Sequence, residues 1–376
     1  MSQKVKAKVV KKKKSFPWGK IWYYFKSLFS NGICLEIATS LKWFWSIIVF
    51  VLATLIAVIQ PTVTASQIKG DQIFISQYSD PFYYGLNDYL NFVNEEDEEQ
   101  ENKDIVFNIS TKQLEGTYKS DSYLGYISSN GQYNVPAPFY SSFREGKRIL
   151  DIYVTNDLAH NNQDWLKSIA ESNPDYGEAS TEERKNMEDL KYKRTSSFII
   201  FTNDKVYFAL IASSGQVNSQ INGNYNYILE NFPKLKENGK ATYTFADILG
   251  YEVTTNDVVA KQKQVIQNAG SYANKATYDT INTQTWVTFG IYAGVDGGIM
   301  IVMAFIVFAM TRGKNNPNRS TTLLQSFSIA FWMSITPALI TLAFGFILPQ
   351  FGPMLFLICY SFRIMFLSMK YLRPAV

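Results

Sequence analysis

The sequence predicts an α-helical membrane protein with four transmembrane helices and an extracytoplasmic α+β domain inserted between helices 1 and 2. Two observations predict this fold class: four long apolar segments, and about 220 residues with strand patterns between the first and second of them. A third observation, the placement of lysine and arginine, indicates the orientation. The mean hydropathy of −0.10 resembles that of a soluble protein because it averages two different kinds of segment.

Each apolar segment is long enough, or nearly so, to cross a membrane. About 20 residues span a hydrocarbon core at a rise of about 1.5 Å per residue. Buried helices of a large soluble protein are the alternative, which runs of this length with so few polar positions disfavour. The four segments are 44–63, 286–310, 323–348 and 352–369.

The basic residues predict which ends lie inside. Residues 1–42 hold ten lysines and one acid, about +9, whereas the whole chain carries +4, which leaves about −5 for the rest. The loop 311–320 and the tail 370–376 are also basic. Because cytoplasmic loops are enriched in Lys and Arg, we expect a multi-pass protein of the bacterial plasma membrane, with both termini cytoplasmic and the large domain outside.

The same pattern divides the chain into four parts. Residues 1–42 form a basic cytoplasmic N-terminus, 43–63 the first transmembrane helix, 64–284 the extracytoplasmic α+β domain, and 285–376 the remaining three helices with a short tail. A cleaved signal peptide is the competing interpretation of the first span, because Val63-Thr64-Ala65 before Ser66 resembles a cleavage site. The apolar run and the segment before it are both too long for that.

Two features of the N-terminus predict contact with the membrane surface. Trp18 and Trp22 begin a helical pattern of apolar residues that continues to Phe29, which favours a helix lying in the inner interface. Packing of this helix on another subunit is the alternative, and Ser30-Asn31-Gly32 is expected to end it. The preceding lysine run is expected to set topology and to touch anionic lipid, not nucleic acid. It comprises Lys11, Lys12, Lys13 and Lys14.

The large external region reads as one α+β domain, or two small ones. Its clearest element is a β-hairpin signal around Asn203-Asp204. The acidic run 94–104 reads as a solvated loop. Both cysteines, Cys34 and Cys359, lie outside this region, so it is not a disulfide scaffold. Further strands are expected from Asp104, from Arg148 and in 242–253, polar helical stretches at 180–194 and 224–239, and a helical stalk over 257–284.

No catalytic motif is present. Nucleophile elbows, phosphate loops and HExxH patterns are missing. The single histidine, His160, lies in a polar stretch typical of a surface residue. A carboxylate pair for glycoside hydrolysis stays open, since such pairs are distant in the chain. We therefore expect no enzyme, no cofactor and no metal site.

The second apolar segment contains a row of small residues and one acid. Gly290, Gly294 and Gly298 recur every four residues and form a groove that allows close helix packing in lipid. Asp296 lies roughly 200° around the helix from Gly294, so it points away from that groove. If the groove meets a neighbouring helix and Asp296 avoids lipid, this span should be central in its bundle.

Depth predicts a partner for the acid. Asp296 lies ten residues, about 15 Å, from the outer end of its segment, and Arg363 lies eleven residues, about 16 Å, from the outer end of the fourth. We therefore expect an ion pair, because a lone charge at mid-bilayer costs roughly 2.5–3.5 kcal/mol. Snorkelling of Arg363 toward the cytoplasm is the alternative. The third span places Ser334, Thr336 and the helix-bending Pro337 near the same level. The pair would be structural, or part of a proton or ion pathway.

The sequence resembles an uncharacterised family of bacterial polytopic membrane proteins, some of whose members carry the name maltodextrin utilisation protein. The resemblance covers nearly the whole chain and rests on YYFKSLFSNG, IVFNISTKQLEG, RILDIYVTND, FIIFTNDKVYFALI and ITPALI. It implies a link to maltodextrin uptake and no residue roles. The lysine-rich N-terminus and the acidic run depart from the family pattern.

We expect a non-catalytic accessory or scaffolding protein that supports carbohydrate uptake through contact with a permease. Expected partners are membrane lipids, a membrane protein such as a sugar permease or a second copy, and a glycan at the external domain, but no nucleic acid. The tyrosine-rich stretches 77–92 and 222–232 suit sugar stacking, protein contact or a core equally. The alternative is a small oligomeric transporter or channel that uses the Asp296 region; a sensor lacks an output domain.

Overall fold

The computed structural model describes residues 18–95, 103–116, 123–124, 135–136, 138–155, 169, 194–212, 215–237, 239–255, 257–312, 316–348 and 351–372. The chain divides into two compact units. We call them the helical unit, residues 1–67 and 284–376, and the sheet domain, residues 68–283. The lysine run 11–14 and His160 lie outside the described residues, as do most of the expected helical stretch 180–194 and the acidic run.

Among the described residues, the helical unit contains four helices that are long and apolar enough to cross a membrane. This confirms the coarse fold that the sequence predicted: a mostly helical chain with four such helices and a separate domain that contains strands. The helices of this unit are α1 (Trp18–Ser27), α2 (Asn31–Ser40), α3 (Trp43–Ser66), α11 (Tyr278–Met310), α12 (Leu323–Gly345) and α13 (Gly352–Leu367). Short η5 (Pro317–Ser320) precedes α12, and the π-helix η7 (Ser368–Leu372) continues α13.

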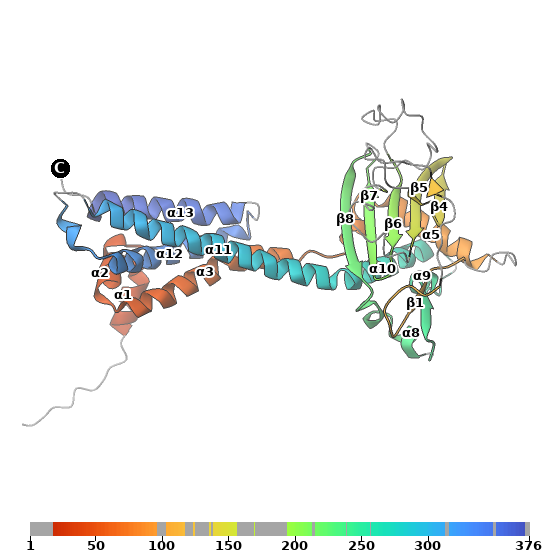
Figure 1. Ribbon diagram of the computed structural model, residues 1–376, viewed down its shortest axis with the longest axis horizontal. Helices are drawn as coiled ribbons and strands as arrows, with labels where there is room; N and C mark the ends of the chain where they lie inside the picture. Colours follow the sequence, from red (N-terminus) through yellow and green to blue (C-terminus); the bar gives the residue numbers. More distant parts are fainter. Residues whose placement is uncertain are drawn as a thin grey trace, which may run out of the picture. The chain divides into compact units, whose positions relative to one another are not determined.

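The central helix of this unit is α12, not α11 as the glycine row suggested. Half of the residues in the most apolar stretch of α12 are buried, whereas 28% are buried in the corresponding stretches of α3 and of α11. It packs against α2, α3 and α13 (Figure 1). One aromatic contact of this packing joins Phe50 of α3 to Phe331 of α12, with ring centroids 4.6 Å apart.

The N-terminal segment forms two helices where the sequence predicted one. The Ser30-Asn31-Gly32 stretch does not simply end a helix, because α1 already ends at Ser27 and α2 begins at Asn31. The Ser30 hydroxyl accepts from the Ile33 amide at 3.5 Å, which is the usual role of serine before a helix. Cys34, Ile37 and Ala38 then form the buried face of α2.

The sheet domain is built on a five-stranded sheet of order β4-β5-β6-β7-β8 (Figure 1). Only β5 and β6 are parallel, and a connection of about 40 residues joins them, as a parallel pair requires. The expected hairpin is β6 and β7, antiparallel around Asn203-Asp204. The strands are β4 (Tyr140–Arg144), β5 (Lys147–Val154), β6 (Ser197–Phe201), β7 (Lys205–Ile211) and β8 (Val217–Asn224). Two small pairs accompany them: β1 (Val106–Asn108) with β9 (Thr242–Thr244), and β2 (Tyr123–Leu124) with β3 (Val135–Pro136).

Successive side chains along a strand point to opposite faces of the central sheet, and apolar side chains are buried on both faces. In β6, Ile199 and Phe201 belong to the larger core, whereas Phe198 and Ile200 belong to a smaller cluster on the other face. Residues from helices complete the larger core. These helices are α4 (Gln72–Ile75), α5 (Asp80–Asn94), α9 (Phe245–Leu249) and α10 (Val258–Ala276), with η4 (Ile228–Glu230) and α8 (Pro233–Glu237) beside them.

The expected stalk is instead a core helix. α10 begins where the Asp257 carboxylate accepts from the Ala260 amide at 2.7 Å. Its buried residues belong to the main core: Val265, Ala269, Tyr272, Ala273 and Ala276. Helix and sheet approach closely here, since a Cβ at Gly223 of β8 would lie 2.2 Å from the Ala276 carbonyl oxygen.

Candidate functional site

A polar cluster in the helical unit gathers around the end of α1. A helix leaves its last carbonyl groups without intrahelical partners. The Ser27 carbonyl accepts from Nη2 of Arg363 at 2.7 Å, and the Leu28 carbonyl accepts from the Thr336 hydroxyl at 2.7 Å. The guanidinium is also favoured by the negative end of the helix dipole. Hydrogen bonds from Arg363 of α13 and Thr336 of α12 therefore hold the end of α1 against the long apolar helices.

Pro337 leaves a second carbonyl free to accept from the same arginine. Pro337 has no amide hydrogen, so the carbonyl four residues earlier, that of Met333, lacks its usual helix partner. That carbonyl accepts from Nη1 of Arg363 at 3.1 Å, and Nε of Arg363 donates to the Asn31 side chain at 3.1 Å. Every nitrogen of the guanidinium thus has a partner, as a buried cation requires.

The expected ion pair between Asp296 and Arg363 is not formed. The sequence placed both charges at a similar depth, but Arg363 uses its donors on carbonyl groups and on Asn31. Of the two hydroxyls expected to steady a pair, that of Thr336 joins the Arg363 cluster, whereas that of Ser334 donates to the Phe331 carbonyl of its own helix at 2.7 Å.

Asp296 is buried without a partner. Its side chain is 4% exposed, and it makes no hydrogen bond or ion pair with any residue that the structure describes. It lies on the one buried face of α11, beside Gly297, where a Cβ would come 3.3 Å from the ring of Phe50. The rest of this face consists of Met300, Ala304 and Val307.

Because the carboxylate is unpaired, we expect Asp296→Asn to leave the full chain at least as stable as the wild type. A charge at mid-membrane costs roughly 2.5–3.5 kcal/mol, and an amide of the same shape carries none. Thermal unfolding in mild detergent measures the difference, with Asp296→Ala as the matched variant that also removes the side-chain volume. A loss of stability in Asp296→Asn would show that the carboxylate has a partner after all.

The glycine row does not pack on any helix that the structure describes. A Cβ at Gly290, Gly294 or Gly298 would meet no atom within 4 Å. The expected groove is therefore an open face of α11 among the described residues. Trp22, expected at the lipid interface, is exposed on α1, and of Trp18 only the backbone is described.

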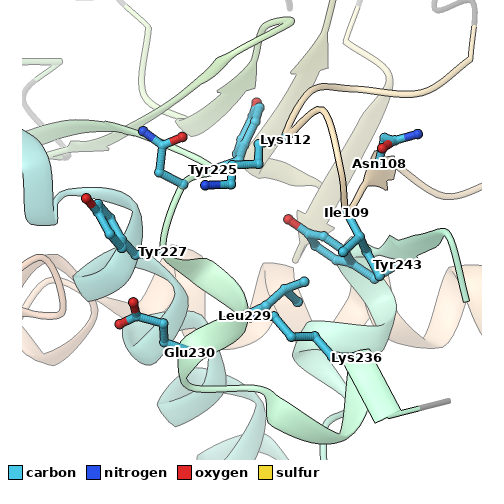
Figure 2. Close-up of a pocket in the computed structure, with 10 residues that line it drawn as sticks. Asn108, Ile109, Lys112, Tyr225, Tyr227, Leu229, Glu230, Lys236 and Tyr243 are labelled. Atoms are coloured by element: carbon cyan, nitrogen blue, oxygen red, sulfur yellow. The ribbon is translucent and has the colours of Figure 1, made fainter. Parts of the chain in front are cut away.

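The sheet domain carries a pocket that sequence reasoning did not assemble. Its volume is about 240 Å³, and it is formed by two regions distant in the chain, 108–112 and 225–243. Figure 2 shows Tyr227 and Tyr243 on opposite sides of it. The lining residues are Asn108, Ile109, Lys112, Tyr225, Asn226, Tyr227, Leu229, Glu230, Lys236 and Tyr243. The tyrosine-rich stretch near Tyr225 was the one signal in the sequence.

The pocket combines aromatic surface with fixed polar groups. Burial raises the pKa of Tyr225 and of Tyr243, so both phenols stay protonated. The Tyr225 hydroxyl lies 2.8 Å from the Thr202 carbonyl and 2.6 Å from that of Lys205, which holds its ring in place. Glu230 is paired with Lys275 at 2.6 Å. Lys112 and Lys236 are exposed at the rim. The partly exposed ring of Tyr227 can stack on a polyhydroxylated ligand, and the lysines at the rim can hydrogen-bond to it.

A buried ion pair elsewhere in the sheet domain is structural. Asp151 of β5 pairs with Arg194 and also accepts from the hydroxyls of Ser196 at 2.6 Å and Ser141 at 2.7 Å. Both charged groups are buried and their hydrogen bonds are internal. Within the described part of the chain, no group of three or more His, Cys, Asp or Glu side chains is placed to hold a metal ion.

No family model matches the chain, and no curated protein or solved structure is detectably similar to it. The class of protein therefore follows from the fold: a mostly helical chain with four helices that could cross a membrane, joined to a domain that contains strands.

Proposed function

We propose that this is a non-catalytic membrane accessory protein whose sheet domain binds a glycan at the tyrosine-lined pocket. The pocket carries the proposal, because it combines the partly exposed ring of Tyr227, amide groups and two lysines in one concavity. The lysine-rich first 42 residues favour cytoplasmic termini and therefore an extracytoplasmic sheet domain in a bacterial plasma membrane. A glycan outside the cell would meet the pocket in that orientation.

Maltoheptaose binding to the full chain in lipid nanodiscs, measured by calorimetry, tests this function. We expect Tyr227→Ala to weaken binding about tenfold, since an aromatic contact contributes about 1.5 kcal/mol. Tyr227 lines the pocket and is only partly buried, so its removal should not unfold the domain.

The matched control is Tyr78→Ala, at an exposed tyrosine that does not line the pocket. Its affinity should equal that of the wild type. If the wild-type chain gives no binding heat with maltodextrins or with other neutral glycans, the pocket does not bind a glycan. A protein partner is then the next ligand to test at the pocket.

The open glycine face of α11 supports the second half of the proposal, contact with a permease. Gly290, Gly294 and Gly298 leave room for another helix to approach closely. Photo-cross-linking from position 294 in the native membrane, followed by mass spectrometry, identifies what covers this face. A sugar permease supports the accessory role, whereas a second copy of this chain or lipid alone argues against contact there.

One observation favours a different function. Asp296 is buried and unpartnered, and intramembrane acids often mark proton or ion pathways. A small oligomeric transporter or channel that uses the Asp296 region is therefore the second candidate. Ion or sugar flux in vesicles that contain the full chain, lost in Asp296→Asn, would support it; flux that the substitution leaves unchanged would exclude Asp296 from the pathway.

A further inference from the structure

The helices α1 and α2 are joined by a turn at Leu28–Ser30, and this turn lies deep along the apolar helices. We propose that α1 and α2 form a re-entrant hairpin, which enters one leaflet to about the bilayer midplane and returns to the same surface. Its exposed aromatic face, Trp22, Phe25 and Phe29, then contacts the acyl chains of that leaflet. This differs from the surface helix that the sequence predicted, and it does not depend on the proposed function.

The first measure of depth comes from α12. Thr336 lies 13 residues from the start of α12 and nine from its end, or about 20 Å and about 14 Å along the axis. Its hydroxyl donates directly to the Leu28 carbonyl at 2.7 Å. A threonine side chain is too short to bridge a difference in depth. The turn of the hairpin therefore lies in the middle third of α12.

A second span gives the same depth independently. Arg363 lies 11 residues after the start of α13 and nine before the end of η7, or about 16 Å and about 14 Å. Its guanidinium bonds the Ser27 carbonyl and the Met333 carbonyl together. Both spans thus place the end of α1 near the centre of a hydrocarbon core about 30 Å thick.

The lengths of the helices fit a path in and out of one leaflet. α1 and α2 have ten residues each, about 15 Å, which is half of the core thickness. α3 has 24 residues, about 36 Å, a full span that begins at Trp43. Phe50, seven residues into α3, packs on Phe331, eight residues into α12, and Gln60 lies against Gly345 toward the other ends of the same helices. The two helices therefore run in the same direction and begin level. The chain has therefore returned to the surface where α12 begins.

The side chains of α1 suit acyl chains. Trp22, Phe25 and Phe29 are 57%, 48% and 79% exposed, and consecutive rings lie 5.3 and 5.6 Å apart. In water this apolar face would be unfavourable, whereas at the depth given above lipid chains cover it. Lys26 is compatible with this position, because its amino group lies 5.8 Å from the centre of the Trp22 ring, one turn back toward the surface.

Depth measurement by spin labelling tests the hairpin in the full chain. A nitroxide is attached at Phe29→Cys, with Cys34→Ala and Cys359→Ala, in phosphatidylglycerol–phosphatidylcholine vesicles. Collision rates with oxygen and with a nickel chelate give the depth. Two exposed reference positions bracket the result: Leu324→Cys in the first turn of α12, and Val295→Cys in the middle of α11.

We expect the label at position 29 to lie at least about 10 Å deeper than the label at position 324, close to that at position 295. A depth nearer to position 324 would overturn the hairpin and restore a helix at the surface. If the cysteine-free background does not fold, Phe29→Cys is labelled in the otherwise native chain, where Cys34 is buried, with the unsubstituted chain as the blank. Which side of the membrane holds position 324 is read separately, with an impermeant thiol reagent.

Discussion

Replacing Arg363 with methionine is expected to lower the free energy of unfolding of the full chain by about 4 kcal/mol, because each buried acceptor left unpaired costs about 1–3 kcal/mol. Methionine keeps much of the side-chain volume but donates no hydrogen bond. The carbonyls of Ser27 and Met333 would then lose their partner, as would the Asn31 side chain. Unfolding in mild detergent with increasing dodecyl sulfate measures the change.

Two variants sharpen this result. Arg319→Met removes an exposed arginine before α12 and should change stability by less than about 0.5 kcal/mol. Arg363→Lys keeps the charge but loses the planar set of donors, so an intermediate loss is expected. If Arg363→Met behaves like Arg319→Met, the arginine cluster does not hold α1 on the bundle.

The second large effect is expected in the sheet domain, where Arg194→Met should cost about 3–5 kcal/mol. The substitution removes the buried cation of Asp151 and leaves the carboxylate with only Arg148, whose side chain is partly exposed and lies 3.0 Å from it. It also removes the donors to the Tyr153 hydroxyl at 3.0 Å and to the Ser196 carbonyl at 3.0 Å. Thermal unfolding of the full chain, followed by circular dichroism, reports the loss.

A double-mutant cycle separates the ion pair from simple loss of packing. Asp151→Asn combined with Arg194→Met should lose much less than the two single losses added together, because the double variant removes both fully buried charges and leaves only Arg148, which is partly exposed to solvent, without its carboxylate. The control is Lys234→Met, which breaks an exposed pair with Glu252 and should cost less than about 1 kcal/mol. Additive losses in the double variant would show that the two charges are not coupled.

Local patterns predicted the elements better than their contacts. The long apolar runs, the β6–β7 hairpin and strands β1, β5 and β9 follow from hydrophobicity and turn residues that act over a few positions. α10 was misread as a stalk because its composition is polar. Its apolar residues nevertheless recur at helical spacing from Val265 to Ala276, a signal that could have placed it in the core.

The candidate sites show the limit of such reasoning. Position along a helix follows from counting residues, and Asp296 and Arg363 lie near the middle of their apolar helices. Depth does not give the direction in which a side chain points, and it cannot reveal the free carbonyls of a short helix that folds back onto the bundle. The pocket could not be predicted for a similar reason, since residues 108–112 and 225–243 meet only in the folded domain.

The sequence by itself determined four membrane-length helices and a strand-containing region between the first two, because hydrophobic length and alternation are properties of consecutive residues. Only the tertiary structure decided that α12 is central, that Arg363 binds the end of α1, and that Asp296 has no partner among the described residues. These outcomes depend on which helix faces meet. That choice is made by packing between residues hundreds of positions apart, as in the hydrogen bond from Thr336 to Leu28.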